Sequence, residues 1–382
     1  MEKHVFELVR GLIDRGIDVH IICEDRSFLP DPNHELADRV IGIDPDSLTE
    51  QGWTERYLEK AARFSEVLDA EQYDIVHCHN HYGYRVVDRL ADMRDRPALV
   101  STFHLTPLGA LERFAALGVP EPEGAPIDRA VAAMERTVAR GSDCCIAVSR
   151  GVGQEIERFY GVGWDRIQVI YNWYDPSIFY PHDRKAARQL LGLNPNARYL
   201  LYIGHFGLHR GQFLAAALRL LPANIKMVVI HPEADEQIRA EFGERVVFAG
   251  YVPVERMALY YSAADLQCFP TVYAGFGLVL VEGMACGCPA VVCNHTAMNE
   301  IVTTESGYLV DEPTPGAYAA QVMAGLRQGD RKRSAAIERA RTFRMQRGID
   351  AVVDVYRRVL VAGTSTETYQ RGSEVKAKRS GT

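Results

Sequence analysis

The hydrophobic positions along the chain alternate between a helical spacing and short continuous runs. Residues 3–15 place Val5, Leu8 and Leu12 on one face, which predicts an amphipathic helix, and the apolar run at 19–23 predicts a strand. The alternation continues with predicted helices at 54–69 and 127–140 and predicted strands at 74–78, 98–102, 144–148 and 168–170. Strands separated by helices indicate βαβ units and a parallel sheet.

A second series of apolar runs follows a polar, proline-containing stretch. Its predicted strands lie at 199–203, 226–230, 246–248, 266–269 and 290–292. We therefore predict an α/β protein with two Rossmann-like domains, residues 1–180 and 199–344, joined by a linker at 181–198. A helix at 345–361 is expected to cross back, and the polar residues 362–382 are expected to form a disordered tail. Because parallel sheets bind ligands beyond the carboxyl ends of their strands, we expect the two domains to face each other across a cleft.

Composition narrows the class of protein further. The 382 residues carry a net charge of -7 with no basic stripe, which argues against a nucleic-acid partner. The first ten residues lack the apolar core of a signal peptide, and the most apolar run, 276–293, contains Glu282 and Pro289. We therefore expect a cytoplasmic protein with at most peripheral membrane contact. The sequence sets no oligomeric state.

The eight cysteines do not have the spacing of a zinc site. There is no C-x-x-C pair, and Cys286 and Cys288 are separated by one glycine only. Most of the cysteines lie in apolar stretches, so we expect them to be buried thiols.

The segment 270–292, PTVYAGFGLVLVEGMACGCPAVV, carries the clearest chemistry. Gly275 and Gly277 allow close approach of the backbone to a ligand, and the helix that follows offers free N–H groups to a phosphate. Glu282, about one turn inside that helix, is placed to accept hydrogen bonds from ribose hydroxyls. A strand-to-helix turn with a solvated glutamate is the alternative, and the length of the whole string disfavours it.

This segment resembles the signature of the retaining family-4 glycosyltransferases, E-G-F-G-L-x-x-x-E-A-M-A-C-G-x-P-V-V. Further resemblances follow in the family's order over nearly the whole chain. They are Glu2-Lys3-His4-Val5, Asp74-Ile75-Val76-His77-Cys78-His79-Asn80, Thr102-Phe103-His104, Ala147-Val148-Ser149, Ile170-Tyr171-Asn172 with Asp175 and Phe179, Gly250-Tyr251-Val252 and Asn299-Glu300-Ile301-Val302.

The resemblance implies a GT-B fold and a hexosyltransferase that moves a sugar from a nucleotide donor to an acceptor hydroxyl with retention at the anomeric carbon. The carboxy-terminal domain would hold the donor, and the amino-terminal domain a small-molecule or lipid-linked acceptor. The nucleotide sugar, expected to be UDP-linked, is a substrate, and no cofactor or metal is expected. Natural-product or glycan biosynthesis is the expected context.

The resemblance also implies roles for individual residues. His104, near the transferred sugar, and Glu282, at the ribose, are the catalytic candidates. The donor-binding candidates are Gly204, His205, Arg210, Ala274, Gly275, Phe276, Gly277, Leu278 and Glu282. The acceptor-side or loop candidates are His79, Asn80, His81 and Asn172. A spacing of two would also let His77 and His79 share a metal, but we favour packing and acceptor contacts for them.

Two departures from the family pattern bear on the donor. Ala274 replaces a glutamate that usually holds a hydroxyl of the donor sugar, and His205 replaces an arginine, while Arg210 stands where the family has lysine. Alanine accepts no hydrogen bond, so we expect a donor that lacks or modifies that hydroxyl. The alternative is a weakened or inactive homologue that serves as a nucleotide-binding partner. An epimerase or a phosphorylase is disfavoured, because the former lacks the Gly-Phe-Gly-Leu signature as a rule and no pyridoxal-phosphate lysine motif is found.

A third departure concerns the start of the sequence. Family members carry one more strand and a Gly-Gly pair before the position of Glu2, so we expect two neighbouring strands each to lack a ladder partner. Our hypothesis is that Met1 is internal to a longer reading frame. The codons upstream of Met1 test it, and an in-frame stop there would contradict it.

Overall fold

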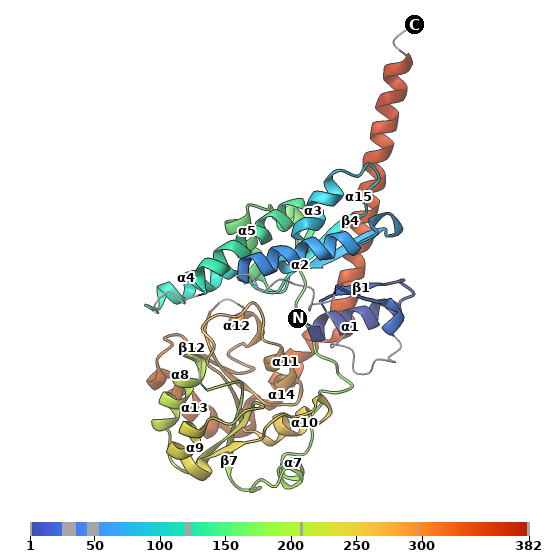
Figure 1. The fold of residues 1–382 in the computed structure, drawn as a ribbon. Helices are drawn as coiled ribbons and strands as arrows, with labels where there is room; N and C mark the ends of the chain where they lie inside the picture. Colours follow the sequence, from blue (N-terminus) through green and yellow to red (C-terminus); the bar gives the residue numbers. More distant parts are fainter. Residues whose placement is uncertain are drawn as a thin grey trace. The chain divides into compact units, whose positions relative to one another are not determined.

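The computed structural model describes residues 2–24, 36–43, 53–118, 124–206, 209–295 and 297–379. Two compact units result, and each is a parallel α/β domain (Figure 1). Unit 1 comprises Met1–Ile170 and Gly348–Thr382, and unit 2 comprises Tyr171–Arg347. The predicted two-domain α/β architecture is confirmed.

The strands of unit 1 form two separate parallel sheets. The larger has the order β3-β4-β5-β6, with β3 at Ile75–His79, β4 at Ala98–Phe103, β5 at Cys144–Ala147 and β6 at Ile167–Val169. The smaller pairs β1, Ile21–Cys23, with β2, Val40–Gly42. A cavity of about 300 Å³ is lined by both β1 and β3. Within the described ranges these two strands do not pair with each other.

The helices of unit 1 pack mostly against one another and against the larger sheet. They are α1 (Glu2–Ile13), α2 (Trp53–Val67), α3 (Tyr84–Ala91), α4 (Pro107–Ala116), α5 (Ala125–Gly141) and α6 (Arg150–Glu155). Hydroxyl side chains fix two of the helix starts, because Thr106 accepts from Gly109 N at the start of α4 and Ser149 accepts from Val152 N at the start of α6. Figure 1 shows α2, α3, α4 and α5 together beside β4.

The last helix, α15 (Met345–Arg379), begins in unit 2 and returns the chain to unit 1. Its first turns are tied to α1, since Arg15 donates to Asp350 over 2.8 Å and Gly11 leaves room for the Ile349 side chain. The predicted crossover helix is therefore present. Its predicted end at residue 361 is wrong, because the helix continues through the segment that we predicted to be disordered. No proline interrupts the sequence there, and its Glu, Lys, Arg and Gln residues favour helix.

Unit 2 is built on one six-stranded parallel sheet with the order β12-β11-β10-β7-β8-β9. The strands are β7 (Arg198–Ile203), β8 (Ile225–Ile230), β9 (Val246–Phe248), β10 (Leu266–Phe269), β11 (Ala290–Cys293) and β12 (Tyr308–Val310). The helices are α7 (Arg184–Leu190), α8 (His209–Arg219), α9 (Glu236–Phe242), α10 (Val254–Ala263), α11 (Leu278–Ala285), α12 (Met298–Ile301), α13 (Pro315–Gln328) and α14 (Arg333–Ala340). All five strands predicted for this half are present, and the short strand β12 was missed.

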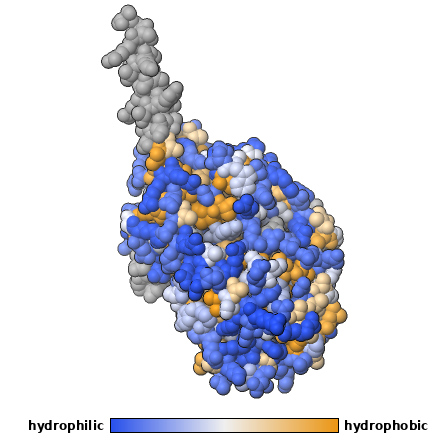
Figure 2. Space-filling view, turned by 180° about the vertical axis from the view of Figure 1, so that it is seen from behind, coloured by the Kyte–Doolittle hydropathy of each residue, from blue (hydrophilic) through white to orange (hydrophobic). Residues whose placement is uncertain are grey.

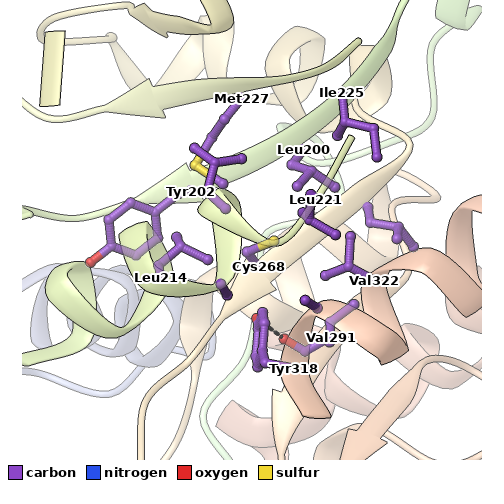
Figure 3. Packing of buried hydrophobic residues seen from close by; sticks show 14 of the residues in the cluster. Leu200, Tyr202, Leu214, Leu221, Ile225, Met227, Cys268, Val291, Tyr318 and Val322 are labelled. Atoms are coloured by element: carbon purple, nitrogen blue, oxygen red, sulfur yellow. Dashed lines mark hydrogen bonds between the residues drawn. The ribbon is translucent and has the colours of Figure 1, made fainter. Parts of the chain in front are cut away.

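The core of unit 2 packs apolar side chains of the sheet against α8 and α13. Figure 3 shows Leu200, Met227 and Cys268 of the sheet in this cluster together with Leu214 and Val322 of the two helices. The buried Tyr318 hydroxyl donates to the Val291 carbonyl over 2.7 Å, so this polar atom in the core is satisfied. All eight cysteines lie in described positions and are free thiols; six are buried, whereas Cys23 and Cys78 are partly exposed.

The predicted linker 181–198 is wrong, because that stretch is packed into unit 2. Arg188 of α7 is 4% exposed and donates to Asp265 over 2.8 Å and to the Ala263 carbonyl over 2.8 Å. Trp173 and Phe179 are also buried. The unit boundary consequently falls after Ile170, not at 180. The prolines of this stretch indicated a loop. The buried Arg188–Asp265 ion pair that anchors the stretch joins residues far apart in the sequence, so no local pattern indicated it.

The surface is mixed in polarity. On the face shown in Figure 2, hydrophilic residues predominate and apolar residues are interspersed among them. Among the helices that the structure describes, none has the length and apolar composition needed to cross a bilayer.

Candidate functional site

Three histidines meet at the carboxyl end of the larger sheet in unit 1. His79 is the last residue of β3 and His104 directly follows β4, so parallel pairing of the two strands brings the rings together. His79 Nδ1 lies 3.0 Å from His104 Nε2, and the rings stack with centroids 5.3 Å apart. His4 of α1 packs edge-on, 5.0 Å from the His104 ring and 5.9 Å from the His79 ring. The sequence had not pointed to His4 as a member of this group.

Burial keeps this cluster uncharged at neutral pH. It lowers the pKa of His4 and His104 well below 6.5, and it lowers the pKa of His79 to about 4. The neighbouring histidines add a smaller contribution in the same direction for His4 and His104, because one protonated ring disfavours another. Neutral imidazoles each offer one acceptor nitrogen, so the cluster can accept a hydrogen bond from a ligand or coordinate a cation.

The fourth histidine of the group, His77, positions its neighbour. Its ring stacks on His79 with centroids 4.8 Å apart, which confirms the prediction that the two share a face of β3. Both of its nitrogens are engaged, since they lie 2.6 Å from the Tyr356 hydroxyl and 2.7 Å from Thr102 Oγ1. His77 is thereby bonded to α15, and it holds the His79 ring from behind.

His81 does not join the other histidines. It is 9% exposed and packs between Tyr57 of α2 and Tyr82, with ring centroids 4.9 and 4.4 Å away. Burial, followed by the charge of Lys60, lowers its pKa to about 4. The structure therefore separates His81 from the acceptor-side set in which the sequence placed it: the chain turns at Asn80 and points the next side chain toward α2.

Asn80 fixes the His104 loop through a buried network. It is the one non-glycine residue in the described ranges with positive φ, at 50°. Its Oδ1 accepts from the backbone N–H of His104 over 3.0 Å, and its Nδ2 donates to Glu135 of α5 over 3.0 Å. The Tyr160 hydroxyl donates to the second oxygen of Glu135. Asn80 was predicted as a loop candidate, whereas Glu135 has the helical spacing of an ordinary residue and carries no sequence signal.

Burial raises the pKa of Glu135 to about 8, although its hydrogen bonds to Tyr160 and Asn80 oppose the rise. The side chain is 0% exposed. The carboxyl is therefore largely protonated at neutral pH. It is connected to the His104 loop through the hydrogen bonds of Asn80.

The donor-loop candidates in unit 2 form the strand–loop–helix that the sequence predicted. β10 ends at Phe269, the loop runs to Gly277, and α11 begins at Leu278. Glu282 is 6% exposed and accepts from the Tyr261 hydroxyl over 2.9 Å. This bond fixes the carboxylate on α11, and the pKa of Tyr261 is raised well above 10 by burial and then by Glu282.

The loop itself is closely packed. Phe276 is buried and its ring lies 6.2 Å from Tyr171 and 5.8 Å from Phe343, so it anchors the loop within unit 2. A Cβ at Gly277 would lie 2.7 Å from the Cδ1 atom of Leu280, so a larger residue there would require the Leu280 side chain to shift. Gly275 is buried, whereas Ala274 and Leu278 are partly exposed and remain available to a ligand.

A second glycine loop follows β7. Gly204 has φ of +148° and donates to the Ile230 carbonyl over 3.1 Å, and the His205 ring lies 4.8 Å from His231. A Cβ at Gly211 would lie 2.1 Å from the Phe206 backbone, so only glycine allows α8 to start so close to this loop. Arg210 on the first turn of α8 is exposed. Residues 207 and 208 of the predicted motif lie outside the described residues.

Asn172 belongs to unit 2 and not to the half in which the sequence placed it. It is 4% exposed, and its Oδ1 has no hydrogen-bond partner among the described residues. A buried amide oxygen without a partner is uncommon in a folded protein and marks a position where a ligand donor would be accepted.

Comparison with known proteins agrees with this architecture. Residues 1–178 match the model of Glycosyltransferase Family 4, and residues 183–343 match that of Glycosyl transferases group 1. The chain is 32% identical over 389 residues to the D-inositol 3-phosphate glycosyltransferase of Xylanimonas cellulosilytica, covering 93% of this chain and 91% of that protein. It is 28% identical to the protein of the same name from Acidothermus cellulolyticus, covering 98% and 89%.

Solved structures show the same fold. Sucrose-phosphate synthase from Thermosynechococcus elongatus superposes with a TM-score of 0.78 at 23% identity, over 94% of this chain and 93% of that one. Anabaena HepE in complex with UDP-glucose superposes with a TM-score of 0.68 at 19% identity, over 93% and 94%. Two Rossmann-like units with a returning helix define a glycosyltransferase of the GT-B type. The chain belongs to glycosyltransferase family 4.

Proposed function

We propose that this glycosyltransferase moves a hexosyl group from a nucleoside diphosphate sugar to an acceptor hydroxyl with retention of the anomeric configuration and without a metal. The observation that carries the proposal is the β10–loop–α11 segment. It combines an anchored glycine loop, a helix start and a buried, oriented Glu282 in one element. A helix start favours the diphosphate and a fixed carboxylate favours ribose hydroxyls, so both ends of a nucleotide have a partner.

The remaining roles follow from the same reading. Arg210 is an exposed cation for the diphosphate, and His104 acts on the transferred sugar as a neutral hydrogen-bonding group. UDP is the preferred nucleotide in this proposal, because HepE is described in complex with UDP-glucose. Ala274 favours a donor sugar that lacks or modifies the hydroxyl which a glutamate would otherwise hold.

For the acceptor we propose a phosphorylated polyol. This rests on the relatives named D-inositol 3-phosphate glycosyltransferase, which align over more than nine tenths of this chain. A lipid-linked acceptor is the competing possibility.

The test is a panel of UDP-, TDP- and GDP-sugars, read first by thermal shift and then by transfer to D-inositol 3-phosphate. A bound donor at a hundred times its Kd stabilises the folded protein by about 2.7 kcal/mol. Retention is read from the anomeric coupling of the product by NMR. Turnover of the best donor with an inverted product would refute the stereochemical part alone, and UDP-glucose as the best donor would refute the inference from Ala274.

A second candidate function is favoured by Ala274 and His205: an inactive homologue that binds nucleotides for a partner. It predicts a donor-induced thermal shift with neither transfer nor donor hydrolysis. Detectable transfer from any nucleotide sugar excludes it.

A further inference from the structure

We propose that His4, His79 and His104 form a binding site for one divalent transition-metal ion such as zinc. The bound ion inhibits sugar transfer, because His104 as a metal ligand can no longer bind the transferred sugar. The site consists of three imidazoles from three elements: α1, the end of β3 and the residue after β4. Their candidate ligand atoms all lie within 4.8 Å of one another. The inhibitory part rests on the proposed function, whereas the binding part does not.

One pair of ligand atoms already has nearly the spacing of a zinc site, and the nitrogen of His4 lies within 4.8 Å of both. Tetrahedral zinc bonded to nitrogen at about 2.0–2.1 Å places neighbouring ligand atoms about 3.4 Å apart. The contact between His79 Nδ1 and His104 Nε2 is 3.0 Å, so an ion replaces the hydrogen bond between these atoms after a shift of a few tenths of an ångström. Three histidines with an open fourth position are a ligand set that zinc takes.

Two of the three histidines are held in place. His77 stacks behind His79, and the side-chain oxygen of Asn80 accepts from the backbone N–H of His104, so two of the three ligands are oriented before an ion arrives.

One of the three histidines also borders a cavity. His79 lines the cavity of about 300 Å³ that is lined by Val5 of α1 and Cys23 of β1, whereas His4 and His104 do not line it. Solvent in the cavity therefore reaches the site from the side of His79. Since no carboxylate belongs to the cluster, the site is expected to favour zinc over magnesium or calcium, which prefer oxygen ligands.

Binding is tested on the full chain, stripped with EDTA and titrated with ZnCl₂ by calorimetry. MgCl₂ serves as the comparison ion. We expect one zinc per chain, and an affinity that falls about tenfold or more in His4→Gln and in His79→Gln. His182→Gln in unit 2 is the matched control and should bind as the wild type does. A folded wild-type protein that binds no zinc, or variants that bind it with undiminished affinity, would overturn the site.

Inhibition is tested with the best donor of the panel, in EDTA and at saturating zinc. We expect zinc to reduce turnover of the wild type at least tenfold, and to leave His4→Gln largely uninhibited at the same concentration. Melting curves in EDTA establish that each variant is folded. Zinc binding without inhibition would refute the inhibitory part. A protein that binds zinc but transfers from no donor would refute the proposed function and leave the site standing.

Discussion

Glu135 offers a direct test of how unit 1 holds its histidine loop. The carboxyl is 0% exposed, and burial raises its pKa from the ordinary 4.5 to about 8. Between these values the folded protein binds a proton that the unfolded chain has released. Stability must therefore fall as pH rises through this window, by up to about 1.4 kcal/mol for each pH unit. Between pH 5 and pH 7 this amounts to about 2–3 kcal/mol.

Replacement by glutamine removes that dependence. In Glu135→Gln the amide oxygen keeps the bond from Asn80 Nδ2, and the bond to Tyr160 reverses, because the amide NH₂ donates to the hydroxyl oxygen as a protonated acid would. The variant should match the wild type in stability near pH 5 and exceed it near pH 7. Glu135→Ala should be less stable at both pH values by about 2–4 kcal/mol, because two buried polar groups lose their partner.

The assay is urea unfolding of the full chain at pH 5, 6 and 7. Unfolding is monitored by fluorescence and circular dichroism, which report on unit 1 and unit 2 together. Glu157→Gln, an exposed substitution in the same unit, is the matched control and should give curves parallel to the wild type. Parallel curves for Glu135→Gln and the wild type between pH 5 and pH 7 would show that Glu135 is ionised in the folded protein, and would refute the reasoning.

Three further predictions concern unit 2. Glu282→Gln should abolish most of the donor-induced thermal shift, whereas the exposed control Glu255→Gln should keep it. An unchanged shift in Glu282→Gln would show that Glu282 does not bind the donor. Gly211→Ala should weaken donor binding at least tenfold by calorimetry, because its Cβ would lie 2.1 Å from the Phe206 backbone; unchanged affinity would mean that the loop takes no part in binding. Arg188→Ala should lower the free energy of unfolding, measured in urea, by about 3 kcal/mol, because it leaves Asp265 buried with weaker partners. A loss below about 1 kcal/mol would show that Arg184 and Arg198 suffice to neutralise Asp265.

The sequence by itself determined the α/β class, the order of the elements and the family. Periodicity located the long apolar strands such as β7 and β8, because continuous burial in a parallel sheet leaves a run of apolar residues. It missed β2 and β12, although β6 and β9, which also have three residues each, were predicted. The motif at 270–292 identified the strand, glycine loop and helix, because local backbone geometry dictates glycine and helix residues there.

The tertiary structure alone decided which side chains meet. His4 and His104 are a hundred residues apart, and only the packing of α1 on the ends of β3 and β4 brings them together. Glu135 and Arg188 look like ordinary helical charges in the sequence, and each becomes functional or structural only because a distant element buries it. Local propensity is encoded within a few residues, whereas burial, and with it pKa and pairing, depends on contacts between segments that no local pattern specifies.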